Sequence, residues 1–295
     1  MLGGCVTAQF QEPVGRYTTA MATANATIRV YFTEMNGFER KVYLKRVLFH
    51  SGLEVLAVDD SQKPTGLTPI FSAASVKARL DAVSLLTAYG EKLAALAGAD
   101  APARFQAGSN VLGENLGKLD VTFQKLSNPA AADPTASKYI ASIAAIIGVF
   151  GQMVLERQRD QAITQAVTTG APAVEAVLAQ LDADLQLVVD PLIDTGVLQE
   201  LSDATNYYNL NRTKLSFDQR AALLDQIDLI AAKYQAAVTA NPSDAVDGIR
   251  DAHAALVTYA RSSRKPQDLA ALIEAIETFN NRLEPIVNAI DKLRS

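Results

Sequence analysis

The side chains with the most capacity for chemistry in this sequence are two histidines, one cysteine and a group of aspartates. His50 and His253 are the candidates for the general base of a Ser-His-Asp set, yet neither stands in a motif that would supply its companions. Motifs typical of nucleophile elbows, phosphate-binding loops, dinucleotide-binding folds and zinc proteases are absent from the sequence. We therefore predict a non-enzymatic protein with no catalytic residues.

Both histidines have structural interpretations. His253 shares a helical stripe with Val246, Ile249 and Leu256, so we expect a hydrogen-bonded histidine in the core or at its boundary. His50 falls at the end of a predicted helix, where a cation interacts favourably with the helix dipole.

Four aspartates, Asp182, Asp184, Asp190 and Asp194, lie close together in the sequence. In di-iron helical bundles such carboxylates accompany Glu-x-x-His motifs, and no Glu-x-x-His occurs here. We therefore expect a solvated acidic face. Two histidines and one cysteine also provide few ligands for a zinc, haem or iron–sulfur site. The sequence predicts neither a metal nor a cofactor.

Cys5 has no neighbours that would activate its thiol as a nucleophile. With the residues before it, Leu2-Gly3-Gly4-Cys5, it resembles a bacterial lipobox: an apolar residue, two small residues and a cysteine. The resemblance implies cleavage before Cys5, a diacylglycerol on its thiol and a membrane anchor. No basic region and apolar segment precede it, as we would expect if this sequence starts just upstream of the cleavage site. The alternative is an incidental exposed cysteine.

The residues after Cys5 extend these expectations. A polar, proline-containing stretch runs to Gly15, so we predict that residues 1–15 are a tether and residues 16–295 a helical domain. By resemblance to enterobacterial lipoproteins, Val6 rather than aspartate after the cysteine favours the outer membrane. The expected location is the periplasmic side of the bacterial cell envelope.

Composition sets further bounds. The chain has 295 residues, of which 49% are hydrophobic, which is enough for one large core or two packed subdomains. A formal net charge of −5 argues against a nucleic-acid partner, which would require a strongly basic face. Basic residues do gather between Phe38 and Phe49, where a solvated helix face is the simpler interpretation than an anionic ligand site.

The most apolar run is the uncharged segment Tyr139–Leu155. As a helix it would span roughly 25 Å, less than the ~30 Å hydrocarbon core of a bilayer. We predict a helix buried inside a bundle, with the small residues Ala144 and Gly148 allowing close packing. The alternative is a concealed helix that enters a membrane, as in helical pore-forming proteins.

Apolar residues at helical spacing predict most of the remaining structure. The predicted helices cover residues 16–49, 73–97, 102–126, 137–167, 172–206, 216–240, 243–264 and 266–293. Asn36-Gly37 is a predicted weak point or break in the first of these helices, and Pro191 a predicted kink or end in the fifth. Predicted connections are residues 50–72 and 127–133, the helix end at Thr169-Gly170, a polar loop over Tyr207–Leu215 and tight turns at Asn241-Pro242 and Lys265-Pro266. Ser216-x-x-Gln219 has the spacing of a capping box.

These elements predict an all-α, up-and-down antiparallel bundle of about eight helices, either compact or elongated into two abutting halves, 16–127 and 137–295. The expected function is that of a lipid-anchored envelope protein that binds a protein partner through its helices. A membrane-acting helical protein and a carrier of a small apolar ligand are the alternatives.

Overall fold

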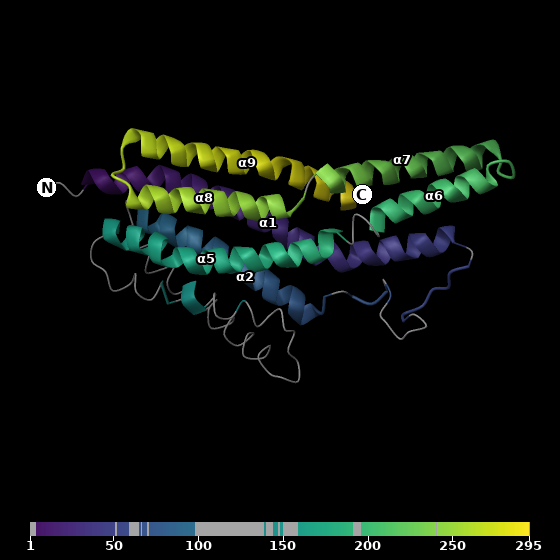
Figure 1. Ribbon diagram of the computed structural model, residues 1–295, viewed down its shortest axis with the longest axis horizontal. Coiled ribbons are helices and arrows are strands. Elements are labelled where there is room, and N and C mark those ends of the chain that lie inside the picture. Colours follow the sequence, from purple (N-terminus) through teal and green to yellow (C-terminus); the bar gives the residue numbers. More distant parts are fainter. Residues whose placement is uncertain are drawn as a thin grey trace. The chain divides into compact units, whose positions relative to one another are not determined.

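The described part of the chain is all α-helical and forms a helical bundle, as the sequence predicts (Figure 1). The computed structural model describes residues 4–50, 52–58, 65, 67–69, 71–97, 139, 144–146, 148–149, 159–190, 196–239 and 241–294. Seven helices lie in this part: α1 (Gly4–Phe49), α2 (Ala73–Ala97), α5 (Arg159–Asp190), α6 (Leu198–Asn211), α7 (Phe217–Thr239), α8 (Ser243–Arg261) and α9 (Pro266–Arg294). The predicted helix over residues 102–126 lies outside the described residues.

The fold consists of two compact units, and each is assembled from three separate stretches of chain. Unit 1 contains Met1–Arg29, Ala73–Ala183 and Ser243–Leu283, and unit 2 contains Val30–Ser72, Asp184–Pro242 and Glu284–Ser295. These units do not follow the boundaries of the predicted halves, residues 16–127 and 137–295, and that division stays a prediction. Helices α1, α5 and α9 each contribute residues to both units, so a boundary drawn between successive helices cannot describe them.

Within unit 1, contacts between paired helices run in opposite directions, as an up-and-down bundle requires. The ring of Phe10 packs edge-on against Tyr259 and the ring of Tyr17 against His253, so α1 and α8 are antiparallel. Further contacts give the same relation for α1 with α2 (Thr18–Gly90, Asn25–Thr87 and Arg29–Ser84). They also give it for α5 with α8, through Glu175–Arg250 and through Thr164 with Arg264 in the turn after α8.

The helix α1 begins earlier than the sequence predicts. Residues 6–15 were expected to form a tether, but they belong to α1, and Phe10, Pro13 and Val14 are buried. Pro13 interrupts the backbone hydrogen bonds of the helix. The guanidinium carbon of Arg264 lies 4.5 Å from the centre of the Phe10 ring. This contact and the burial of Phe10 stabilise the helix around Pro13.

The predicted helix end at Thr169-Gly170 and the new start at Pro172 are also wrong, because α5 runs without a break through these residues. Gly170 has a packing role: a side-chain carbon placed there would lie 3.3 Å from Cε2 of Tyr89. Pro172 is exposed and removes one backbone donor. The buried stripe on either side, from Ile163 to Leu181, outweighs that loss.

The predicted central helix lies mostly outside the described residues. Tyr139, Ala144–Ile146, Gly148 and Val149 are described and helical, and Tyr139, Ile146 and Val149 are buried. Ala144 and Gly148 are exposed, so they do not provide the close packing expected of them. None of the helices in the described part combines the length and the apolarity needed to cross a bilayer.

In unit 2, the helices α6 and α7 form a hairpin (Figure 1). The predicted loop over Tyr207–Leu215 is too long, since α6 continues to Asn211, whose side chain donates to the carbonyl of Tyr207. The predicted capping box at the start of α7 is confirmed: Ser216 N donates to Gln219 Oε1 at 2.9 Å, and Gln219 N donates to Ser216 Oγ at 3.2 Å. The hairpin therefore turns within about five residues.

The predicted weak point at Asn36-Gly37 does not break α1. Asn36 Nδ2 donates to the carbonyl of Phe71 at 2.9 Å, and Phe71 N donates to Asn36 Oδ1 at 3.1 Å. These two bonds hold the end of the predicted connector, residues 50–72, against the helix. The asparagine satisfies the backbone of a neighbouring segment and leaves its own backbone helical.

A buried polar cluster joins α1, α2 and α8 in unit 1. Tyr89 Oη lies 3.0 Å from His253 Nε2, and the rings of Tyr17 and Tyr89 both pack against the imidazole. Burial lowers the pKa of His253 to about 4 and raises the pKa values of both tyrosines. The predicted hydrogen-bonded core histidine is thus confirmed, and it is neutral near pH 7.

Because the folded pKa of His253 lies below the ordinary value of 6.5, its contribution to stability is complete above about pH 6.5. It is lost as the pH falls towards 4, and the loss at pH 4 should be about 3 kcal/mol. The variant His253→Gln keeps a hydrogen-bonding group beside Tyr89 but cannot titrate. Urea unfolding at several pH values should give a flatter profile for this variant between pH 4 and 6.5. Parallel profiles for parent and variant would contradict the assignment.

Candidate functional site

The four predicted acidic residues do not form one solvated face. Asp184 is fully buried and Asp182 is half-buried, whereas the side chain of Asp190 and all of Asp194 lie outside the described residues. Asp184 follows Leu181 by three residues and Val177 by seven, so helical geometry places it on the buried stripe of α5. The prediction of a solvated face is therefore wrong for Asp184, and the spacing could have shown it.

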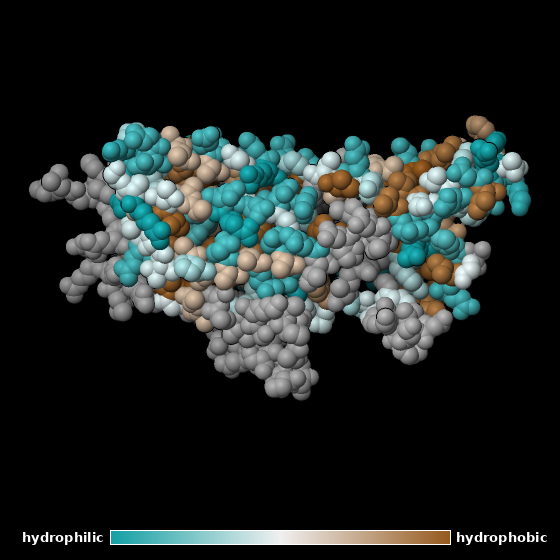
Figure 2. Space-filling model, in the orientation of Figure 1, coloured by the Kyte–Doolittle hydropathy of each residue, from teal (hydrophilic) through white to brown (hydrophobic). Residues whose placement is uncertain are grey.

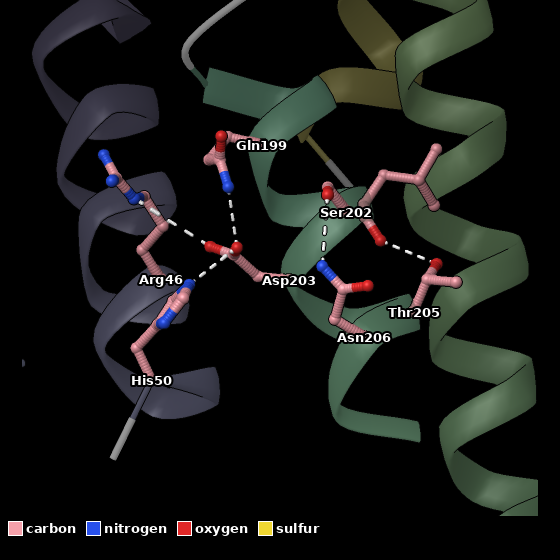
Figure 3. Close-up of polar contacts among 8 residues, drawn as sticks. Arg46, His50, Gln199, Ser202, Asp203, Thr205 and Asn206 are labelled. Atoms are coloured by element: carbon pink, nitrogen blue, oxygen red, sulfur yellow. Dashed lines mark hydrogen bonds and ion pairs between the residues drawn. The ribbon is translucent and has the colours of Figure 1, made fainter. Parts of the chain in front are cut away.

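Carboxylates that the sequence analysis did not single out lie on α6. Glu200 and Asp203 are both buried, and Lys45 and Arg46 at the end of α1 are their cationic partners. Figure 3 shows Asp203 with Arg46 and His50. Lys45 Nζ lies 2.6 Å from Glu200 Oε1, and His50 Nε2 lies 2.7 Å from Asp203 Oδ1. Arg46 Nε is 3.9 Å from the second oxygen of Asp203. Part of the predicted solvated basic face of α1 is thus occupied by acidic side chains of the same chain.

These charges border a small apolar core between α6 and α7. Its buried members are Val197, Ala204 and Ile230, with Phe49, Leu201, Ile227 and Tyr234 packed against them. On the α7 side, Lys233 stands near Lys45, and its pKa is lowered by burial and by that neighbouring cation. The end of α1, α6 and α7 therefore form one mixed polar and apolar cluster.

The chemical capacity of this cluster is limited. His50 and Asp203 resemble the base and the orienting acid of a triad, but Ser202 on the same helix contacts Asn206 and not His50 (Figure 3). Gln199 Nε2 also donates to Asp203 Oδ1, at 2.7 Å. The network holds α6 against the end of α1. Among the described residues no group of three His, Cys, Asp or Glu side chains has the arrangement of a metal site.

Besides this charged cluster, unit 2 has an apolar surface. Every large hydrophobic side chain that is exposed in the described part of the chain belongs to this unit. Figure 2 shows hydrophobic residues, in brown, along the α6–α7 hairpin. They are Leu44, Leu48, Leu53, Val55, Leu56, Val58, Leu198, Tyr207, Leu210, Phe217, Leu224, Leu229, Val238 and Val287. The most exposed are Leu210, at 79%, and Phe217, at 75%, on the two sides of the hairpin turn. Such a concentration is typical of a surface that binds another molecule.

Part of this surface is a regular stripe along α7. Phe217, Leu224, Ala231 and Val238 recur every seven residues, so they share one side of the helix. At helical spacing Leu224 and Val238 share a wide apolar arc with Ile227 and Tyr234. Ile227 and Tyr234 pack on the core of unit 2, but Leu224 and Val238 are about half exposed. One column of this apolar arc is therefore packed and the other is not.

Of the other predicted site residues, Cys5 lies in the first turn of α1, and its side chain is outside the described residues. His50 does lie at a helix end, as predicted, and its carboxylate partner on α6 was not foreseen. Comparison with protein-family models, with curated proteins and with solved structures gives no match.

The ion pair of the half-buried Lys45 with the buried Glu200 should stabilise the fold more than an exposed pair of similar length. Its matched control is Arg282 with Asp251, 2.8 Å apart and exposed on both sides. A double-mutant cycle with Lys45→Met and Glu200→Gln should give a coupling free energy of about 1–3 kcal/mol. A cycle with Arg282→Met and Asp251→Asn should give about 1 kcal/mol or less. Equal couplings from urea unfolding would show that the burial of Glu200 adds nothing.

Proposed function

We propose that this protein is a non-enzymatic lipoprotein of the bacterial cell envelope whose unit 2 binds a protein partner. The observation that carries the proposal is the confinement of exposed large hydrophobic side chains to unit 2, among the described residues. A surface that serves only to face water would spread such side chains singly over the whole molecule. Half of them lie on the two helices of the α6–α7 hairpin, which suits a binding surface.

The arrangement of polar groups supports a non-enzymatic role. His253 is buried against Tyr89, and His50 is engaged with Asp203. Each imidazole therefore has a hydrogen-bonding partner that explains it structurally. The acidic residues Glu200 and Asp203 have cationic partners from α1 and serve the packing of that helix on α6.

The proposed anchor is a lipid on Cys5, as the lipobox-like residues 2–5 imply. Because α1 begins at Gly4 and Phe10 is already buried, little extensible chain separates Cys5 from the packed part of unit 1. Five helical residues span roughly 7 Å. A lipid on Cys5 would therefore hold the packed end of α1 close to the membrane surface.

Anchoring can be tested with the gene expressed from its native upstream sequence. The protein should then incorporate labelled fatty acid and remain in the membrane fraction, since several acyl chains bind a bilayer far more firmly than one. The variant Cys5→Ser should lose the label and become extractable without detergent. Absence of label on the parent protein would refute the anchor and leave the binding role of unit 2 untouched.

Partner binding can be tested with a photoreactive amino acid placed at single exposed positions in cells that naturally produce the protein. Substitution at Leu48 or Leu210 should give the same discrete protein adduct, because both side chains belong to the exposed apolar set of unit 2. Exposed positions of unit 1, Ala254 and Ala270, serve as matched controls and should give none. Adducts of equal yield at all four positions, or no protein adduct at Leu48 and Leu210, would contradict the proposed function.

A further inference from the structure

We infer that the exposed stripe of α7, formed by Phe217, Leu224, Ala231 and Val238, is a docking site for an amphipathic helix of another protein, and that this helix carries basic residues beside its apolar face. The inference rests on the proposed function and names the class of partner for one part of the unit 2 surface.

The geometry of the stripe fits a helix. Apolar residues at a strict seven-residue interval keep one side of a helix facing a partner helix that winds gently around it. The stripe covers three such intervals, or roughly 30 Å. Phe217, Leu224 and Val238 are 75%, 47% and 51% exposed, so side chains are available along the whole length. Ile227 and Tyr234, on the adjacent column, are packed against unit 2 and make the platform rigid.

The charges beside the stripe select the kind of partner. Asp225 and Asp228 are exposed near its middle, and Asp218 is exposed at its start. Basic residues, Arg212, Lys214 and Arg220, lie at the hairpin end. A partner helix with lysines or arginines opposite Asp225 and Asp228 would complement the central part of the surface.

The same two aspartates disfavour the other possible occupants. An anionic lipid surface would be repelled by Asp225 and Asp228 beside the apolar residues. A second copy of this chain, paired antiparallel about the middle of the stripe, would bring these aspartates close to their own equivalents. A basic helix of a different protein meets neither obstacle.

The test uses the full chain and three labelled peptides, each three heptads long. The first has leucine at both core positions and lysine at the flanking positions of its middle heptad. The second has glutamate in place of those lysines, and the third has serine at the core positions. Fluorescence anisotropy should show saturable binding of the lysine peptide, binding about tenfold weaker for the glutamate peptide and none for the serine peptide.

Leu224 and Leu229 form a matched pair of variants. They are 47% and 46% exposed on the same helix, but they point about 140° apart. Leu224→Ser should weaken binding of the lysine peptide about tenfold, whereas Leu229→Ser should leave it unchanged within about twofold. Melting curves of both variants check that the fold survives. The double variant Asp225→Lys, Asp228→Lys should reverse the preference, so that the glutamate peptide binds more tightly.

Several results would overturn the inference: no binding of the lysine peptide, equal binding of the lysine and glutamate peptides, or equal losses in Leu224→Ser and Leu229→Ser. Concentration-dependent dimerisation abolished by Leu224→Ser would overturn it in favour of a second copy. Binding to anionic phospholipid vesicles abolished by Leu224→Ser would overturn it in favour of a membrane. If protein adducts still form at Leu48 and Leu210 in any of these cases, the proposed function stands and the assignment of α7 fails.

Discussion

The fold of unit 2 depends on the neutralisation of two carboxylates that are shielded from water. Glu200 and Asp203 would be costly to bury as isolated anions, so α6 must lie where Lys45 and Arg46 at the end of α1 can reach them. That requirement fixes which turn of α6 faces the end of α1. Because α7 packs on α6 through Ile230 and its neighbours, the position of α6 also determines the position of α7.

The same arrangement explains why part of α7 stays uncovered. Within unit 2, α7 packs on α6 and on the apolar residues that surround Ile230, and this contact uses the column of Ile227 and Tyr234. A helix with apolar residues on a wide arc needs more than one packed neighbour to bury them all. The column of Leu224 and Val238 therefore remains half exposed. An interaction surface here needs no conformational change to become available.

The sequence predicted the helical class, most helix ranges and the capping box at Ser216, because these follow from local periodicity and local hydrogen bonds. It failed where packing overrides local preference. Gly170 has the residue type of a helix end but serves a close contact with the Tyr89 ring. For α7, periodicity reports which residues share a face, and not what covers that face, so it could not separate Leu224 and Val238 from the packed Ile227 and Tyr234. The partners of Glu200 and Asp203, more than 100 residues away in sequence, leave no local signal.

The way the chain divides between its two units bears on how the protein is made. Phe10 and its ring partner Tyr259 are roughly 250 residues apart in sequence, a separation that delays native contacts. At about 5–20 residues per second, α8 follows α1 from the ribosome by roughly 10–50 s. Throughout that interval Phe10 and Tyr17 of α1 lack their native ring partners on α8. A nascent chain with this topology is a natural client for chaperones that shield apolar segments until the rest of the bundle arrives.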